Sequence, residues 1–398
     1  MNTTTPKVVA DRGGRATREK ILAAADAVLA DRDSGDLTLK QIAARLDLHY
    51  TAVYHYFKNR DELESELVVR YAQRRSENLA EARRLHQSIP LQLAKYIDLD
   101  MHEPSSPLLR ARATLAEPYR ERVIKAYQNS RFELELLLKT GMQQGSLRKL
   151  DSSLAAHLVV RVLDRFTNAE DRQFSQAGLE LQSLSDELVA FLQHGILAPE
   201  VEAPGFMCRP PYEFVGLGQS KLDELLCAAT AAFNRRGWRG TSIPQVARDL
   251  GISKTKFYRF AASKEELLFL CALRTVNLIA QVRQAARAAT NNPLQALLLD
   301  THYLRQLLVQ APGPLLSPYL FDWLSAERFR VVDEIYQSLR MDLVDLLKRC
   351  VDAGYVRPLS ALAVQPMITA CGFLPIQSSD DTMYDQVVDI VLKGLSRS

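Results

Sequence analysis

Two seven-residue segments carry hydrogen-bond donors at matching positions of the chain. The first runs from His49 to His55 (HYTAVYH) and the second from Ser253 to Arg259 (SKTKFYR). Lysine, arginine, threonine, tyrosine and histidine side chains donate hydrogen bonds to phosphate oxygens and to the edges of bases. The chemistry that these segments indicate is non-covalent recognition of a nucleic acid.

Motifs for catalysis and for metal binding are missing from the sequence. The chain has no HExxH, no GxSxG and no glycine-rich phosphate loop, and its seven histidines are scattered. We therefore expect a protein that is not an enzyme and has no catalytic residue, no metal site and no cofactor. Five cysteines without a CxxC pair predict reduced thiols.

The composition is that of a globular chain with a local basic region. A length of 398 residues predicts two to four domains, and the net charge is only +3. Residues 213–283, however, hold 11 Lys and Arg against 6 Asp and Glu. No apolar run approaches the ~20 residues of a membrane span, and the N-terminus lacks the apolar region of a signal peptide. We expect a cytosolic protein without a membrane partner.

The chain contains an internal repeat. Residues 21–63 align with residues 225–267, and pairs such as Tyr54 and Tyr258 match at a constant offset of 204. A second window, residues 127–148, aligns with residues 336–357 at an offset of 209. Two windows in the same order indicate two copies of one unit of about 200 residues, joined by a linker rich in proline and glycine.

The periodicity within each copy predicts an all-α fold. Thr38-x-x-Gln41 and Ser242-x-x-Gln245 have the pattern of capping boxes that begin a short helix. A tight turn follows, in which Gly251 can adopt a positive φ, and then a second helix, predicted at 50–57 and at 254–261. Asn59 and Ser263 are expected to cap the next helix. This order is that of a helix-turn-helix, whose second helix enters the DNA major groove.

Both windows resemble the DNA-binding domain of TetR-family transcriptional regulators, whose signature reads roughly T-x-x-x-I-A-x-x-x-G-V-S-x-x-x-x-Y-x-x-F-x-x-K-x-x-L. The second copy matches it with Val246, Ala247, Gly251, Ile252, Ser253, Tyr258, Phe260, Lys264 and Leu267, and the first with Ile42, Ala43, Leu48, Tyr54, Tyr56, Arg60 and Leu63. The first copy departs at Asp47, His49 and Arg60, and the second at Ala261, where an aromatic residue is usual. These departures put equal DNA affinity of the two copies in doubt.

The resemblance implies a division into six segments. They are a basic N-terminal arm (1–16), a first helix-turn-helix domain (17–66), a first helical regulatory domain (67–197), a linker (198–219), a second helix-turn-helix domain (220–270) and a second regulatory domain (271–398). The family's last two helices form a four-helix interface between subunits. We expect them at 153–166 and 184–197 in copy one, and at 359–373 and 383–395 in copy two.

The resemblance also nominates residues that contact DNA. Tyr54 and Tyr258 match a tyrosine that contacts the DNA backbone, and Arg60 and Lys264 match a cation that contacts phosphate. The other candidates are two helix-capping residues and the outward-facing residues of the two recognition helices. They are Thr38, Ser242, Tyr50, Thr51, His55, Lys254, Thr255, Lys256 and Arg259. The alternative for each is a packing or surface role without contact to DNA.

The helical domains of this family bind a small molecule. Residues that could line such a pocket are Tyr119, Tyr127, Arg131, Tyr319, Trp323, Tyr336 and Arg340. The alternative is aromatic packing with cations at the surface. The resemblance does not identify the effector.

These features predict a regulator that binds double-stranded operator DNA, as a repressor that a small-molecule effector releases. We expect it in the bacterial cytoplasm, associated with the nucleoid. The two copies would form an intramolecular pseudo-dimer, with a homodimer through a separate surface as the alternative. A second hypothesis is a cytosolic small-molecule-binding protein in which one or both helix-turn-helices no longer bind DNA.

Overall fold

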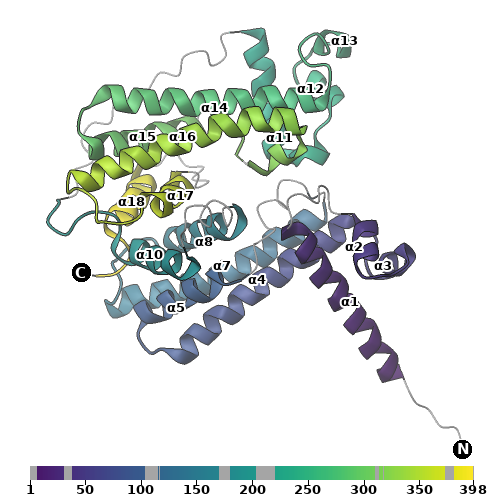
Figure 1. The fold of residues 1–398 in the computed structure, drawn as a ribbon, viewed down its shortest axis with the longest axis horizontal. Coiled ribbons are helices and arrows are strands. Elements are labelled where there is room, and N and C mark those ends of the chain that lie inside the picture. Colours follow the sequence, from purple (N-terminus) through teal and green to yellow (C-terminus); the bar gives the residue numbers. More distant parts are fainter. Residues whose placement is uncertain are drawn as a thin grey trace, which may run out of the picture.

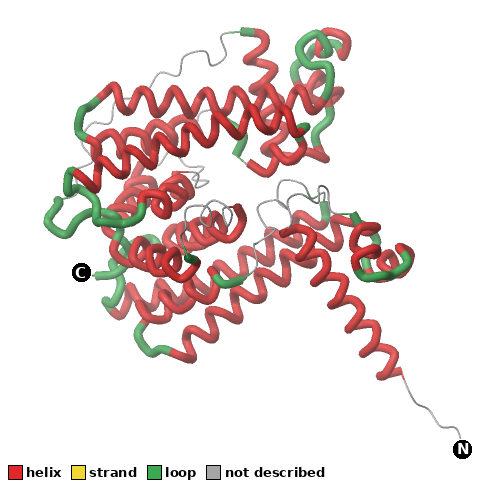
Figure 2. The backbone as a smooth tube through the Cα atoms, in the orientation of Figure 1, coloured by secondary structure: helices red, strands yellow, loops and turns green. Residues whose placement is uncertain are grey.

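The computed structural model describes residues 7–30, 38–103, 115, 117–169, 180–202, 220–309, 313–316, 318–372 and 381–397. Helices dominate this part of the chain, and its extended pairing is limited to two isolated bridges, Leu147 with Ser396 and Leu197 with Val356 (Figure 2). The all-α prediction is confirmed. None of the described helices combines the length and apolar character needed to cross a bilayer.

Two units with the same order of helices form the structure (Figure 1). We call residues 7–202 unit 1 and residues 220–397 unit 2. Unit 1 contains α1 (Lys7–Ala30), α2 (Leu39–Arg45), α3 (Tyr50–Tyr56), α4 (Arg60–Leu85), α5 (Ile89–Met101), α7 (Tyr119–Gln144), α8 (Ser152–Ala169) and α10 (Leu181–His194). Because α1 begins at Lys7, residues 7–16 of the expected arm belong to the same helix as residues 17–30.

Unit 2 repeats this order after the linker. It contains α11 (Lys221–Gly240), α12 (Ile243–Asp249), α13 (Lys254–Phe257), α14 (Lys264–Ala289), α15 (Pro293–Val309), the 3-10 helix η2 (Pro318–Trp323), α16 (Ala326–Asp352), α17 (Ala361–Gly372) and α18 (Asp381–Lys393). Residues 203–219 of the expected linker lie outside the described residues.

Side-chain caps begin several of these helices where the sequence predicts them. The Thr38 and Gln41 pair forms a complete capping box, and Asn59 and Ser263 each accept a hydrogen bond from the backbone N–H three residues on. Such a cap contributes roughly 1 kcal/mol. The box predicted at Ser242 and Gln245 is wrong, because the Ser242 side chain makes no capping hydrogen bond. Pro244 instead starts α12 with a backbone already restrained to helical φ.

Each helix-turn-helix packs into an apolar core of its own unit. In unit 1, Val53 and Phe57 are 0% and 1% exposed and pack with Ile42 and Leu63. In unit 2, Phe257 is 0% exposed and packs with Val246 and Leu267. Full burial of an aliphatic or aromatic side chain contributes about 1.5–3 kcal/mol. The core therefore fixes which faces of α3 and α13 remain outside.

The second of the two predicted recognition helices is shorter than the sequence indicates. The helix expected at 254–261 ends at Phe257, and residues 258–260 form a turn. Helix α3 ends at Tyr56, one residue before its predicted end. In unit 2 the N–H of Tyr258 still bonds to the Lys254 carbonyl, but those of Arg259 and Phe260 bond to carbonyls three residues back. The tighter turn replaces the last α-helical turn there.

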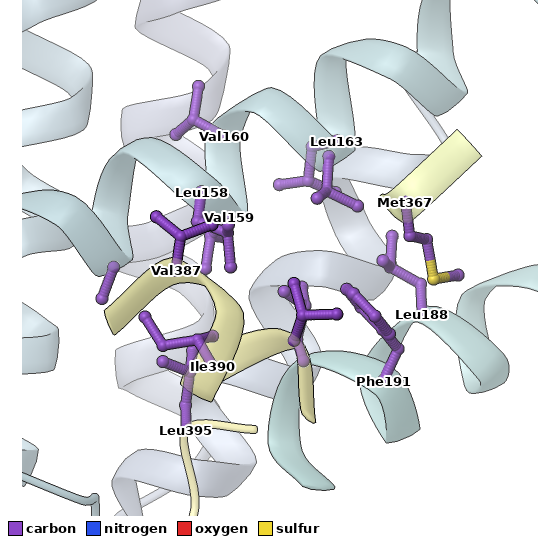
Figure 3. Close-up of a cluster of buried hydrophobic side chains, with 14 of the residues drawn as sticks. Leu158, Val159, Val160, Leu163, Leu188, Phe191, Met367, Val387, Ile390 and Leu395 are labelled. Atoms are coloured by element: carbon purple, nitrogen blue, oxygen red, sulfur yellow. The ribbon is translucent and has the colours of Figure 1, made fainter. Parts of the chain in front are cut away.

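The last two helices of each unit pack together as a four-helix junction. Helices α8 and α10 of unit 1 contact α17 and α18 of unit 2, and their buried side chains form one continuous cluster (Figure 3). The cluster includes Leu158, Leu188, Met367 and Val387. The four helices lie where the sequence analysis expects them, within three residues at each end.

The described cysteines agree with the prediction of reduced thiols. Cys227, Cys271 and Cys350 are free and buried. Burial raises the pKa of Cys227 to about 11 and the pKa of both Cys271 and Cys350 to about 12. Their thiols are therefore poor nucleophiles at neutral pH.

Candidate nucleic-acid interface

The two helix-turn-helices lie at the same end of the molecule, away from the four-helix junction (Figure 1). Nearly all of the residues nominated for DNA contact are exposed there. The exposed members are Thr38, Tyr50, Thr51, Tyr54, His55, Ser242, Lys254, Thr255, Lys256, Tyr258 and Arg259. Arg60 and Lys264 are half-buried. A contact between these residues and DNA stays a prediction.

The outer face of α3 is aromatic. Tyr50 and Tyr54 are 47% and 46% exposed, and their rings meet edge to face at 6.3 Å between centroids. His49 lies against Tyr50, and its Nδ1 is 2.8 Å from the Thr51 hydroxyl oxygen. This face offers hydroxyl and imidazole groups and carries no lysine or arginine within α3.

The outer face of α13 and the turn after it is cationic. Lys254, Lys256 and Arg259 are all exposed, and the Lys254 amine lies 5.8 Å from the centre of the Tyr258 ring. Ser253 caps the helix by accepting from the Lys256 N–H at 3.2 Å. The two units therefore present different chemistry at the corresponding place.

The turn before each recognition helix has the same backbone conformation despite different residues. Gly251 has a φ of 64°, as predicted, and Asp47 at the corresponding place has a φ of 53°. Aspartate is one of the few non-glycine residues that visit this left-handed region. The departure at Asp47 thus preserves the turn.

The two predicted phosphate-contacting cations are engaged within the protein. The Arg60 Nε lies 2.5 Å from Glu64 Oε1. The Lys264 amine lies 4.2 Å from the centre of the Trp238 ring, and burial lowers the pKa of Lys264. Trp238 in turn stacks on Trp323 of η2 at 5.3 Å. Lys264 is thus placed between the DNA-binding helices and the regulatory helices of unit 2.

Contacts between the units near the DNA-binding end were not predicted. Arg239, at the end of α11, pairs with Asp61 at the start of α4. Arg120 of α7 donates to the Arg235 carbonyl. Sequence reasoning had no signal for these pairs, because the partners stand more than 100 positions apart and belong to different units.

Several of the residues nominated for a ligand pocket have described protein partners. Tyr127 donates to Asp164, Arg131 contacts His157, and Tyr336 accepts from Arg165 across the units. Tyr119 accepts from Asn59, and Trp323 stacks on Trp238. The Arg340 side chain is half-buried in α16, and the side chain of Tyr319 lies outside the described residues. A role of these residues in ligand binding stays a prediction.

A buried charge network lies where unit 1 packs α4, α5, α7 and α8 together. Arg75 is 2% exposed and pairs with Asp100 at 2.9 Å and with Asp164 at 2.8 Å. The Tyr127 hydroxyl donates to Asp164 at 2.8 Å, and the Arg75 guanidinium lies 4.7 Å from the Tyr71 ring centre. Burial raises the pKa of Asp100, and Arg75 opposes that rise.

An apolar pocket occurs elsewhere, in unit 2 beside the four-helix junction. Helix α15 lines it with Leu297, Leu298 and Thr301, and α18 with residues that include Tyr384 and Val388. Ile196 of unit 1 completes the wall. We call this the junction pocket. Within the described residues, no group of three His, Cys, Asp or Glu side chains could hold a metal ion.

Comparison with known proteins gives the family. A model described as "Bacterial regulatory proteins, tetR family" matches residues 21–67 and again residues 225–271. The chain is 28% identical over 153 residues to the HTH-type transcriptional repressor KstR2 of Mycobacterium tuberculosis, covering 36% of this chain and 72% of that protein. It is 39% identical over 70 residues to the HTH-type transcriptional activator FasR of Mycolicibacterium smegmatis, covering 17% of this chain and 32% of that protein.

Two solved structures are similar to parts of this chain. The ketosteroid transcriptional regulator KstR2 of M. tuberculosis aligns with 22% identity and a TM-score of 0.39, over 47% of this chain and 100% of that chain. AibR in complex with isovaleryl coenzyme A and operator DNA aligns with 17% identity and a TM-score of 0.40, over 44% and 98%. Both family matches fall on the two helix-turn-helices, and the chain is therefore a DNA-binding regulator of the tetR family with two family units in tandem.

Proposed function

We propose that this tetR-family regulator acts as an intramolecular pseudo-dimer, in which each unit reads one half of an asymmetric operator and a small-molecule effector releases the DNA. The observation that carries the proposal is the reciprocal contact between the two units at the four-helix junction. In such a contact, each half gives the other the same set of interactions, as in a two-fold dimer interface.

The backbone contacts at the junction occur in matched pairs. The Arg148 N–H donates to the Leu395 carbonyl, and the Arg357 N–H donates to the Ile196 carbonyl, each at 2.9 Å. Arg148 and Arg357 are the residues that end the second repeated window. The matching contacts support a junction in which one chain supplies both sides of a dimer interface.

A second set of pairs crosses the same place. Ile196 donates its N–H to the Val391 carbonyl at 3.0 Å, and Leu395 donates to the Leu192 carbonyl at 2.9 Å. Gly195 and Gly394 stand next to these bonds with φ values of 66° and 72°. A Cβ on either glycine would lie 2.3 Å from backbone atoms of the other unit. Both positions thus depend on close approach of the two units.

The different recognition faces support an operator without symmetry. Lysine and arginine favour the O6 and N7 acceptors of guanine, whereas tyrosine, threonine and histidine offer other donors and apolar contacts. Three cations on α13 and its following turn have no counterpart on α3. We expect the unit 2 half-site to contribute more of the electrostatic affinity.

Two parts of the proposal, repression and release by an effector, are supported by the match to the family and by the similarity to a relative named as a repressor. Repression requires that the bound regulator lowers transcription from a promoter that contains the selected operator. A reporter assay with that promoter measures this directly, and the selected operator fragment supplies the probe for release.

The test is selection of binding sites from a random DNA pool with the full chain. We expect two unrelated half-sites about one or more helical turns apart. The matched variants Tyr50→Ala and Lys254→Ala each remove one exposed side chain at the corresponding position of the two recognition segments, and we expect each to relax selection at a different half-site. Recovery of a palindrome, with both variants affecting both halves equally, would show that one unit from each of two chains binds the operator.

A further inference from the structure

We infer that two contacts between the units near the DNA-binding end determine which spacing of half-sites the regulator accepts. They are the ion pair of Asp61 with Arg239 and the hydrogen bond from Arg120 to the Arg235 carbonyl. We call these two contacts the inter-unit clasp. This inference deepens the proposed function, on which its role in DNA binding rests, because both units must read one operator for their separation to matter.

The clasp lies between residues nominated for DNA contact in the two units. Asp61 directly follows Arg60 at the start of α4, and Arg239 stands three positions before Ser242, the N-cap residue of α12. The four-helix junction lies away from both helix-turn-helices (Figure 1). A small rotation of the units about the junction therefore displaces the recognition segments by a larger distance, and a contact at their own end restricts this displacement.

Both sides of the clasp are held in place by their own unit. In unit 1, the Tyr119 hydroxyl accepts from the Asn59 amide at 3.2 Å, which ties the start of α7 to the start of α4. In unit 2, the Arg239 guanidinium lies 5.7 Å from the centre of the Trp323 ring. The ion pair is also partly shielded from solvent, because the side chains of Arg239 and Asp61 are only 29% and 14% exposed. These supports make the pair more persistent than one between two freely mobile side chains.

The ion pair of the clasp cannot be repeated on the other side of the molecule. Arg239 matches Gly35 at the constant offset of 204, and glycine has no charged side chain. Asp61 matches Glu265, whose carboxylate instead accepts from the Ser325 N–H at 2.9 Å within unit 2. The sequence thus provides the acid in both units but the cation in only one of them.

The hydrogen bond of the clasp cannot be repeated either. The offset of 209, continued to the first turn of α16, matches Arg120 to Phe329, whose side chain has no N–H group. In a two-fold dimer of identical chains, a contact occurs twice because each chain supplies both partners. The clasp is therefore a feature of two different units in one chain, and it favours one relative placement of their recognition segments.

A change of one base pair in the operator is large compared with the reach of this clasp. Insertion of one base pair between the half-sites separates them by ~3.4 Å and rotates one against the other by about one tenth of a helical turn. The nitrogen and oxygen atoms of an ion pair must stay within about 4 Å of each other. Binding to the altered operator therefore requires the clasp to break or contacts at one half-site to be lost. Without the clasp, the preference for one spacing should fall.

The first measurement compares operators that contain the two selected half-sites with the spacer as selected, lengthened or shortened by one base pair. Fluorescence anisotropy with the full chain gives the ratio of the affinities, in which a general effect of charge on DNA binding cancels. Asp61→Asn and Arg239→Gln each remove one charge of the pair, from different units. We expect a preference for the selected spacer of at least about tenfold in the parent and below about threefold in each variant.

Glu265→Gln is the matched control. It removes the same charge at the corresponding position of α14, where the carboxylate bonds within unit 2, and it should keep the preference of the parent. The double variant Asp61→Asn with Arg239→Gln should lose no more of the preference than either single variant, because residues in direct contact do not have additive effects.

The second measurement needs no DNA. Nitroxide labels on Thr51→Cys and Thr255→Cys, two exposed and corresponding positions, report the distance between the recognition segments by pulsed electron spin resonance. Cys208→Ser and Cys371→Ser remove two native thiols from the labelled chain. We expect one narrow distance distribution in the parent and in the control variant, and a broader distribution in the two single variants of the clasp.

Equally narrow distance distributions in all variants would overturn the clasp. Broader distributions with an unchanged preference for the selected spacer would overturn its role in operator selection. A loss of preference in Glu265→Gln equal to that in Asp61→Asn would overturn that role as well, since the charges would then act without the ion pair. A chain that gives the expected distance distributions but selects no operator would contradict the proposed function and leave the clasp in place.

Discussion

Lys264 combines a packing contact with the position expected for phosphate binding. Its amine lies over Trp238, and its helix starts beside the recognition segment of unit 2. A cation over an indole ring contributes about 0.5–1 kcal/mol when exposed and more when desolvated. The same charge remains within reach of solvent, because the side chain is only half-buried.

We expect Lys264→Ala to weaken operator binding by a similar factor for all sequences, because a phosphate contact carries no base information. The slope of log affinity against log salt should fall by ~1. Lys264→Arg keeps the charge and should restore the slope, whereas Lys264→Met keeps only the packing and should not. An unchanged slope in Lys264→Ala would mean that this residue does not contact the DNA.

Arg75 is a buried residue whose removal we expect to lower the stability of unit 1. It neutralises Asp100 and Asp164, which are both 0% exposed. Removal of one partner from a buried ion pair costs about 3–5 kcal/mol, since the remaining charge has neither water nor a counter-ion.

We expect Arg75→Met to lower the free energy of unfolding by about 3–5 kcal/mol at neutral pH. Burial already raises the pKa of Asp100 in the parent chain, and loss of the guanidinium raises it further. A carboxyl with a raised folded-state pKa is protonated first in the folded state, so the deficit shrinks as the pH falls through that pKa. Urea unfolding across the acid range measures this. Arg84→Met, at an exposed pair with Glu81, is the control and should change little at any pH.

At the scale of elements, Gly195 and Gly394 lie where the segment after α10 packs against the segment after α18. The close contact of these two segments sets how closely the two units approach. Each glycine follows the last helix of its unit and has a positive φ. The Cβ of an alanine at Gly394 would lie 2.3 Å from the Gln193 carbonyl oxygen, which is backbone and cannot rotate away. Substitution at Gly394 must therefore move the segment after α18 away from the segment after α10.

We expect Gly394→Ala to lower the melting temperature and to weaken the contact between the units. Gly354→Ala is the matched control, because its φ is 73° but no atom lies within 4 Å of the added Cβ. The control should show only the backbone strain of roughly 1 kcal/mol, whereas overpacking adds about 1–3 kcal/mol or more at Gly394. Equal melting temperatures for the two variants would contradict the close contact between the segments after α10 and α18.

Among the residues that the structure describes, the two units contact each other at the four-helix junction and near the DNA-binding end. The four-helix junction buries a continuous apolar cluster, and the pair of Asp61 with Arg239 links the units near the DNA-binding end. Linkage through one chain makes the second contact intramolecular, so association does not depend on protein concentration.

We therefore expect light scattering after size exclusion to give a mass near 44.8 kDa across a wide range of protein concentration. Dimerisation through a separate surface would double the mass but leave the contacts within each chain intact. An obligate dimer in which unit 1 pairs with unit 1 would contradict the intramolecular model. Cross-linking through cysteines introduced at Arg148 and Leu395 distinguishes pairing within a chain from pairing between chains.

The sequence by itself determined the repeat, the all-α class and the position of both helix-turn-helices. These features rest on local patterns: apolar spacing along a helix, caps such as Thr38 and Asn59, and a turn that needs a residue tolerant of positive φ. Each of them involves residues a few positions apart, so that their spacing can be seen in one window. The expected positions of the last two helices of each copy came instead from the resemblance to the family.

Only the tertiary structure decided which partners these helices meet. The pairing of Tyr127 with Asp164 joins residues 37 positions apart in the sequence. The local pattern also did not predict the end of α13 at Phe257 or the missing cap at Ser242. The same holds for the junction pocket, which takes walls from both units. The spacing of apolar residues along the chain identifies which face a helix can bury. It does not identify the helix that covers this face, because many apolar faces can pack against one another. The contacts in three dimensions determine the pairing.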